Sequence, residues 1–173
     1  MRIGRLIRHL TAMSWRTRTR FPRSTLEAVE AAIASVERMH AGTVCLVIET
    51  ALPVREVLEG LTPRMRACRL FASLRLWDTD TRNGVLIYVL AADRSLEIVA
   101  DRGLSERIGA ADWEAVCRTM QTHFRQGRYR AGTIAAVEAV GGLLARQFPV
   151  DRVPPGGPPS HPADPLPHQP SLL

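Results

Sequence analysis

Four polar residues carry the oxygen atoms most suited to chemistry in this sequence, and they flank two neighbouring apolar runs. Asp78, Asp80 and Asn83 precede the first run, and Asp101 follows the second. Carboxylate and amide oxygens are the ligands that Ca²⁺ and Mg²⁺ require. These four residues are therefore our candidate metal ligands, with Ca²⁺ or Mg²⁺ as the candidate cofactor.

The same residues also have a purely structural interpretation. Against the EF-hand template, Arg82 takes the fifth position, Asn83 takes that of the turn glycine, and Val89 takes that of the bidentate glutamate. A turn explains the residue types as well, because Asn-Gly permits positive φ and Asp caps its own backbone. The cation site and the structural turn both remain open.

No catalytic residue can be assigned from sequence motifs. The chain lacks a Gly-x-Ser-x-Gly elbow, a glycine-rich phosphate loop and a His-Glu-x-x-His motif. His40 and His123 are scattered, as expected of ordinary surface or core histidines. A serine or cysteine hydrolase mechanism is therefore not expected.

The excess positive charge lies on an N-terminal arm, residues 1–23. This arm holds seven arginines and no acid, whereas residues 24–173 hold sixteen arginines against seventeen acids. The net charge of +6 therefore reflects a basic arm, not a basic domain. We do not expect nucleic acid as a partner, because few aromatic side chains are interleaved with the arginines.

The arm has the pattern of an amphipathic helix followed by a tryptophan. Its apolar face could lie on an anionic membrane, with arginines meeting the headgroups, or on a protein partner. It could equally dock on the domain's own core. The candidate membrane- or partner-binding residues are Arg2, Ile3, Arg5, Leu6, Ile7, Arg8, Leu10 and Trp15. No segment is long and apolar enough to span a membrane, so we expect a cytoplasmic protein, with peripheral contact at the inner membrane face.

The rest of the chain predicts a single α/β domain over residues 24–149. The run Val44 to Ile48 reads as a strand buried on both faces, and residues 85–90 and 95–100 as a β-hairpin. Ser24 and Glu27 have capping-box spacing for a first helix. A second helix should begin at Thr62-Pro63 and bury a stripe of apolar residues. That predicted stripe consists of Met65, Cys68, Phe71 and Leu74.

Two more helices should follow the hairpin, and a disordered tail should end the chain. Nine of the twelve prolines lie in residues 149–173, so residues 150–173 should form a Pro-rich disordered tail. The fold class is therefore α/β: a central mixed β-sheet with a hairpin, flanked by helices on both faces as an α/β sandwich.

The hairpin region resembles the TPM-domain family. The resemblance rests on residues 76–79 (LWDT), 83–89 (NGVLIYV), 93–94 (DR) and 97–104 (EIVADRGL), and it continues through a set of later positions. Those positions are Trp113, Met120, Phe124, Gly127, Tyr129 and Gly132. The family includes a thylakoid-lumen acid phosphatase, photosystem-repair proteins and a receptor-accessory protein. The chain is most similar to its short, anchorless bacterial form.

The resemblance implies an α/β sandwich and association with envelope proteins such as LemA-type proteins. Exported relatives carry Gly-x-Gly-Leu-Glu after the second hairpin strand, whereas this chain has Ser105 in place of the glutamate. Phosphatase activity and calcium binding, which the resemblance suggests, are weakened by that departure. We therefore expect a non-catalytic accessory or interaction domain, acting at the cell envelope or with a protein partner. The alternative is a Ca²⁺- or Mg²⁺-dependent, acid-phosphatase-like hydrolase that uses the Asp-rich loop.

Overall fold

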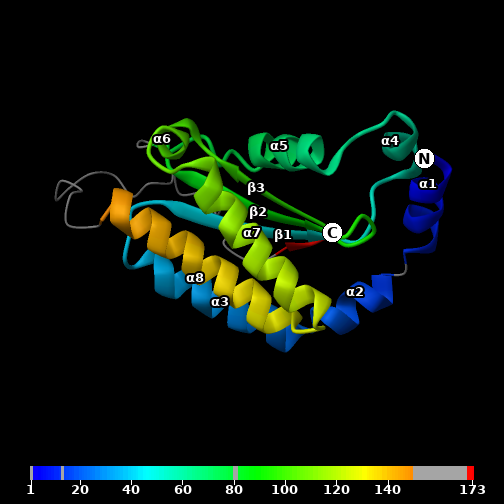
Figure 1. Ribbon diagram of the computed structural model, residues 1–173, viewed down its shortest axis with the longest axis horizontal. Helices are drawn as coiled ribbons and strands as arrows, with labels where there is room; N and C mark the ends of the chain where they lie inside the picture. Colours follow the sequence, from blue (N-terminus) through cyan, green and yellow to red (C-terminus); the bar gives the residue numbers. More distant parts are fainter. Residues whose placement is uncertain (1, 13, 80–81, 150–170) are drawn as a thin grey trace.

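The computed structural model describes residues 2–12, 14–79, 82–149 and 171–173, and within them it contains eight helices and a four-stranded sheet (Figure 1). The elements in chain order are α1 (Arg2–Thr11), α2 (Ser14–Arg20), α3 (Arg23–Glu37), β1 (Thr43–Glu49), α4 (Val54–Leu58), α5 (Pro63–Ser73), β2 (Gly84–Leu90), β3 (Ser95–Ala100), α6 (Arg102–Ser105), α7 (Ala110–Arg125), α8 (Tyr129–Gln147) and β4 (Ser171–Leu172).

The sheet is mixed and has the strand order β3-β2-β1-β4. Strands β1 and β2 are parallel, with Cys45 opposite Leu86, and are joined by a crossover that contains α4 and α5. Strands β2 and β3 form the predicted antiparallel hairpin, with Leu86 opposite Val99. The α/β class, the mixed sheet and the hairpin are therefore confirmed.

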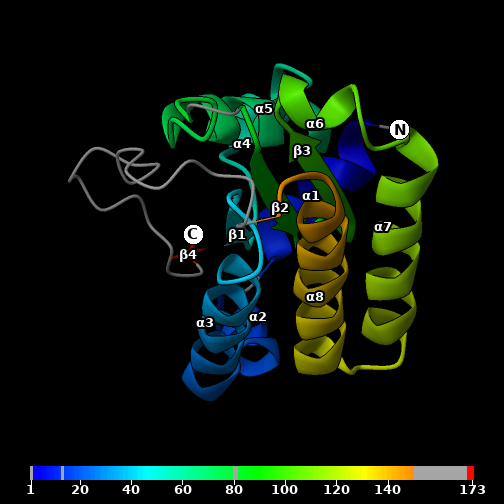
Figure 2. The same cartoon turned by 90° about the vertical axis from the view of Figure 1, so that its left-hand side faces the viewer.

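Both faces of the sheet are covered, as the unbroken apolar runs predict. Every residue of β1 and of β2 is buried. Alternate β1 side chains enter two separate cores: Leu46 packs with α3, α7 and α8, whereas Val47 packs with α4 and α5. Figures 1 and 2 show α5 on one side of the sheet and α3, α7 and α8 on the other. A parallel strand pair requires this two-sided cover.

The first domain helix begins earlier than its sequence pattern suggests. Pro22 is the N-cap residue of α3, with φ −64°, and no side chain caps this helix end. The amide of Thr25 donates to the carbonyl of Pro22 at 2.8 Å, so the first turn closes on the proline. Glu27 pairs with Arg23 at 3.0 Å instead of reaching Ser24. The predicted capping box is therefore wrong, because the helix starts at Arg23 and Ser24 already lies inside it instead of at its N-cap.

The second helix begins where it was predicted to begin but buries a different face. The hydroxyl of Thr62 accepts a hydrogen bond from the Met65 amide at 3.2 Å, as a capping residue does. The buried residues of α5 are Ala67 and Leu70, whereas Met65 and Cys68 are exposed. The predicted stripe is wrong at those two positions, because helical spacing alone does not choose between adjacent apolar arcs.

The end of the chain returns to the sheet. The predicted Pro-rich tail lies outside the described residues except for residues 171–173. Ser171 lies opposite Val47 in a parallel pairing, and the Thr50 amide donates to the Leu173 carbonyl at 3.0 Å. These last residues therefore continue the sheet beyond β1.

Helices α3 and α8 are in close contact at Gly141. A Cβ atom added to Gly141 would lie 2.5 Å from the Cβ atom of Val36, whereas one added to the adjacent Gly142 would meet nothing within 4 Å. The first position therefore requires glycine for packing, and the second does not.

We expect Gly141→Ala to lower the free energy of unfolding by about 1–3 kcal/mol, because the new methyl group overpacks a rigid contact. Gly142→Ala should raise it by up to about 1 kcal/mol through higher helix propensity. Urea unfolding of the two variants provides the comparison. Equal effects at the two positions would contradict the close approach of α3 and α8.

Candidate functional site

Three of the four candidate metal ligands are described, and each has a structural role. Asp78 forms an exposed ion pair with Arg75, at 2.5 Å. Asp101 is the N-cap residue of α6, and its Oδ1 accepts a hydrogen bond from the Arg102 amide at 2.7 Å. Asn83 is completely buried, and its Nδ2 donates to the Ala41 carbonyl at 3.0 Å. Asp80 lies outside the described residues.

Two buried oxygens at this end of the sheet have no hydrogen-bond partner among the described residues. They are Oδ1 of Asn83 and Oδ2 of Asp101. The hairpin register brings both residues to one end of the sheet, since the Asp101 amide donates to the Gly84 carbonyl at 2.9 Å. Within the described residues, no group of three or more His, Cys, Asp or Glu is placed to hold a metal. These two oxygens thus fit a hard cation only as part of a larger ligand set.

The N-terminal helix α1 is oriented with its polar side toward the domain. Arg5 and His9 face inward, and Leu6 is half-buried against the core that includes α5. Ile3, Ile7 and Leu10 are 74%, 53% and 61% exposed. The alternative in which the apolar face docks on the domain's own core is therefore wrong for these three residues.

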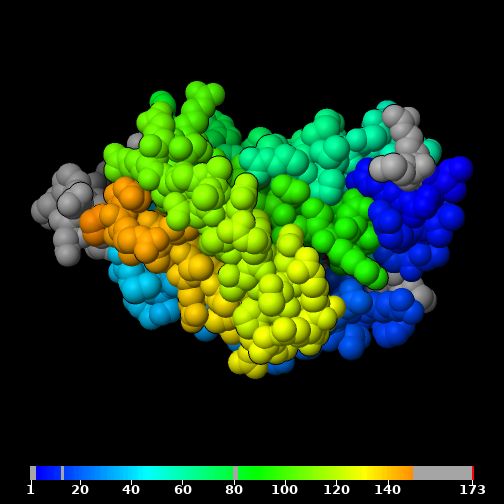
Figure 3. All heavy atoms as spheres, viewed as in Figure 1, coloured from blue at the N-terminus to red at the C-terminus, as the bar shows by residue number. Residues whose placement is uncertain are grey.

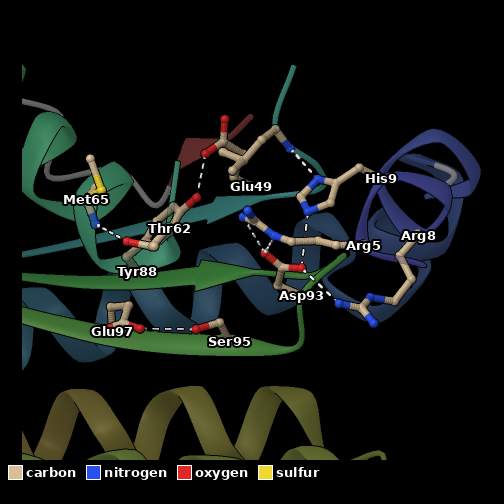
Figure 4. Close-up of polar contacts among 11 residues, drawn as sticks. Arg5, Arg8, His9, Glu49, Thr62, Met65, Tyr88, Asp93, Ser95 and Glu97 are labelled. Atoms are coloured by element: carbon tan, nitrogen blue, oxygen red, sulfur yellow. Dashed lines mark hydrogen bonds and ion pairs between the residues drawn. The ribbon is translucent and has the colours of Figure 1, made fainter. Parts of the chain in front are cut away.

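A buried carboxylate at the β2–β3 turn holds α1 in this orientation (Figure 4). The Arg5 Nε atom donates to Oδ2 of Asp93 at 2.8 Å, and the Arg8 Nη2 atom lies 3.4 Å from Oδ1. The His9 Nε2 atom lies 3.2 Å from the same Oδ1, and its Nδ1 accepts the Leu52 amide at 2.9 Å. Asp93 therefore links the N-terminal helix to the far end of the hairpin. We define Arg5, Arg8, His9, Asp93 and Leu52 as the arm anchor.

The electrostatics of the arm anchor favour the ionised form of Asp93. Burial of the side chain, which is 8% exposed, raises the pKa of Asp93, but the hydrogen bond and charge of Arg5 and the nearby His9 outweigh it, and the net pKa is lowered. The Nδ1 atom of His9 must be unprotonated to accept the Leu52 amide. Because the His9 side chain is fully buried, this His–Asp pair is structural and is not exposed to a substrate.

A second buried polar cluster, which motif searching missed, lies at the carboxyl end of β1. Glu49 accepts a hydrogen bond from the Tyr88 hydroxyl at 2.6 Å, and two nitrogens of Arg66 donate to its two oxygens at 2.8 and 2.9 Å. Burial and the Glu49 carboxylate raise the pKa of Tyr88. With its oxygens bonded in this way, Glu49 is satisfied as a buried charge. We interpret the cluster as a structural link between β1, β2 and α5.

The α1 and α2 helices also carry a concentration of exposed positive charge. Arg8, Arg16, Arg18 and Arg20 are exposed, and Arg16 lies 5.5 Å from the ring centroid of the exposed Trp15. The side chain of Arg2 lies outside the described part. The described candidate arm residues therefore divide into an inward pair, Arg5 and Leu6, and an outward set.

Within the described residues, no helix has both the length and the apolar composition needed to cross a membrane.

Comparison with known proteins supplies a family and a structural neighbour. The family model described as "TPM domain" matches residues 18–143, and α1 precedes the matched region. The chain is also similar to the NMR structure of the BA42 protein from the psychrophilic bacterium Bizionia argentinensis, with 26% sequence identity and a TM-score of 0.70. That similarity covers 87% of this chain and 93% of the other. No curated protein matches the chain.

Removing the charge of Asp93 should release α1. In Asp93→Asn, Arg5 and His9 lose a partly buried anionic partner, so we expect a loss of about 1–3 kcal/mol in local stability. Hydrogen exchange at the Leu52 amide measures this loss directly, because that amide donates to His9. Glu59→Gln is the control: its partner Arg55 is exposed, so it should change stability by less than about 1 kcal/mol.

The effect of Asp93 should also depend on pH with a defined sign. Because the folded-state pKa lies below the ordinary 3.8, its stabilising contribution is complete above that value and is lost as pH falls through the lowered pKa. The difference in Leu52 protection between wild type and Asp93→Asn should therefore narrow below pH 3.8. A difference that narrows only on raising the pH would contradict this assignment.

Proposed function

The chain belongs to the TPM-domain family, and we propose that it acts as a non-catalytic accessory domain that attaches to an anionic membrane surface through the outer face of α1. We define this outer face as Ile3, Ile7 and Leu10. The observation that carries the proposal is the orientation of α1. A surface helix ordinarily turns its apolar residues toward the core, whereas here the arm anchor holds the outer face in water.

The chemistry of the arm favours a lipid surface as the occupant. Three exposed aliphatic side chains on one helix face are suited to shallow insertion, and each would contribute on the order of 1 kcal/mol on leaving water. The exposed arginines of α1 and α2 would each add about 1 kcal/mol near anionic headgroups. Stable peripheral attachment generally requires two such signals, and the arm carries both.

The arm anchor supports the proposal by keeping the outer face preorganised. A free amphipathic segment must become helical when it binds a membrane, at a cost in conformational entropy. In this chain α1 is held against the hairpin by Asp93. The outer face is therefore available without further folding.

Replacing the outer face should weaken membrane binding without unfolding the protein. We expect Ile7→Gln/Leu10→Gln to lower the partition coefficient onto vesicles of equal phosphatidylglycerol and phosphatidylcholine by on the order of tenfold or more. Co-sedimentation provides the measurement. High salt should also weaken wild-type binding, because the arginine contribution is screened.

The matched control is Met39→Gln/Met65→Gln, which removes two side chains of similar exposure, 51% and 50%, outside α1. This variant should bind vesicles as wild type does. Equal sedimentation of wild type with phosphatidylcholine vesicles alone would contradict an anionic surface. No binding of wild type to any vesicle would refute the proposal and favour a protein partner, such as a LemA-type envelope protein.

A second candidate function is cation-dependent phosphate-ester hydrolysis at the Asp-rich loop. The observation that favours it is the pair of unpartnered buried oxygens, Asn83 Oδ1 and Asp101 Oδ2. Buried polar atoms ordinarily find partners, and a bound Ca²⁺ or Mg²⁺ at this end of the sheet is a ligand of the kind that carboxylate and amide oxygens hold. Asp78 and Asp80 would complete the ligand set if Asp78 left Arg75. When bound, the cation would supply Lewis-acid stabilisation of a phosphoryl oxygen.

Titration with Ca²⁺ and then Mg²⁺ tests this second candidate. We expect saturable amide shifts in residues 76–79, 82–84 and 100–106, and their loss in Asp101→Asn. Asparagine is an equally good N-cap residue, so that variant should keep its stability within about 0.5 kcal/mol. Cation-dependent hydrolysis of a phosphomonoester should also be lost in Asp78→Ala. Equal rates in that variant and wild type would exclude the hydrolase.

A further inference from the structure

A basic cavity lies next to the arm anchor, between the end of α2, the β2–β3 turn and the end of α7. Its volume is about 590 Å³. Three arginines from these three segments line it: Arg20, Arg94 and Arg125. Figure 3 shows α1 and α2, the hairpin and the α7–α8 region adjoining one another at one end of the molecule. The cavity is thus built by segments far apart in sequence.

The three guanidinium groups form no ion pair with any carboxylate in the described part of the chain. Asp93 immediately precedes Arg94, but its carboxylate turns toward Arg5 and His9 in the arm anchor. Arg20 instead lies over the Tyr129 ring at 5.3 Å from its centroid. Three like charges around one hollow repel one another, so this cavity is suited to an anion.

The wall of the cavity includes a set of packed aromatic rings. Phe21, Phe124 and Tyr129 line it, and their ring centroids are separated by 5.0 to 5.8 Å. Such mutual edge contacts hold aromatic rings in place. The ligand that fits therefore has an anionic group for the arginines and a less polar portion for the rings.

Resting on the proposed function, we infer that this cavity binds the phosphate headgroup of an anionic phospholipid. Guanidinium groups donate paired hydrogen bonds that match phosphate oxygens. Because the segments that build the cavity adjoin α1 at one end of the molecule (Figure 3), we place the cavity and the outer face of α1 against the same membrane surface. A neighbouring hollow shares Arg20 and Tyr129 and adds Arg128 and Arg130. This hollow extends the basic surface along the same end of the domain.

Soluble ligands separate headgroup binding from membrane insertion. Full-length protein would be titrated with monomeric dihexanoyl-phosphatidylglycerol, with sn-glycerol 3-phosphate and with dihexanoyl-phosphatidylcholine, with backbone amide shifts as the readout. We expect saturable shifts at residues 20–21, 91–96 and 121–129 with the anionic lipid. Shifts should be weaker with glycerol 3-phosphate and absent with the zwitterionic lipid.

The variant Arg94→Gln/Arg125→Gln should weaken binding of the anionic lipid by on the order of tenfold or more, because two charged donors are lost. Arg94 has a φ of 52°, and glutamine retains a Cβ atom, so the backbone demand of the turn is unchanged. Arg38→Gln/Arg146→Gln is the control, since these two exposed arginines carry the same total charge and neither lines the cavity.

Three results would overturn the inference, and the first two are no saturable shift with the anionic lipid and equal affinity in wild type and the double variant. Tighter binding of glycerol 3-phosphate than of the lipid would reassign the cavity to a soluble phosphate ester and so also overturn it. The outcome is independent of the vesicle experiment. Ile7→Gln/Leu10→Gln should lose vesicle binding but keep the amide shifts with the soluble anionic lipid. Arg94→Gln/Arg125→Gln should lose those amide shifts.

Discussion

The carboxylate of Asp93 determines how the N-terminal helix α1 is oriented on the domain. It forms ion pairs with Arg5 and Arg8 and lies 3.2 Å from the His9 Nε2 atom, and a lone buried carboxylate in that place would be strongly unfavourable. Because Arg5 and His9 must face Asp93, Ile3, Ile7 and Leu10 of the same helix face outward. The carboxylate also turns away from Arg94, so the neighbouring cavity keeps its positive charge. The contacts of Asp93 therefore fix both the exposure of the outer face of α1 and the positive charge of the cavity.

Strands β1, β2 and β3 could be predicted from the sequence, whereas β4 and the orientation of the helices could not. Strands β1 and β2 are unbroken apolar runs that can be buried only between two layers, so their runs already required helices on both faces. In α1, helical periodicity identified the apolar residues but not the side that faces the domain. The deciding partner, Asp93, lies 84 positions after His9. The same limit applies to α5, where Ala67 and Leu70 are buried instead of Met65 and Cys68.

The candidate sites could likewise be predicted only in part from the sequence. Hairpin geometry placed Asn83 and Asp101 at one end of the sheet, because an antiparallel strand ends where its partner begins. The pairing of Asp78 with Arg75 and the capping role of Asp101 depend on side-chain conformations that residue spacing does not determine. The arginine-lined cavity could not be found from spacing at all, since Arg20, Arg94 and Arg125 come from three separate segments. The close contact of Gly141 with Val36 also depends on two distant helices.

The end of β1 and the loop that follows it form hydrogen bonds with residues near both ends of the described chain. Ile48 and Thr50 bond to Leu173 through their backbones, and the Leu52 amide bonds to His9. During synthesis, His9 emerges long before Leu52 and Asp93. Helix α1 therefore cannot dock on the domain until the hairpin has formed. The edge of β1 stays unpaired for longer, until residues 171–173 have been synthesised. Until then that edge is an open template for another chain, so the order of translation leaves a nascent domain exposed to intermolecular strand pairing.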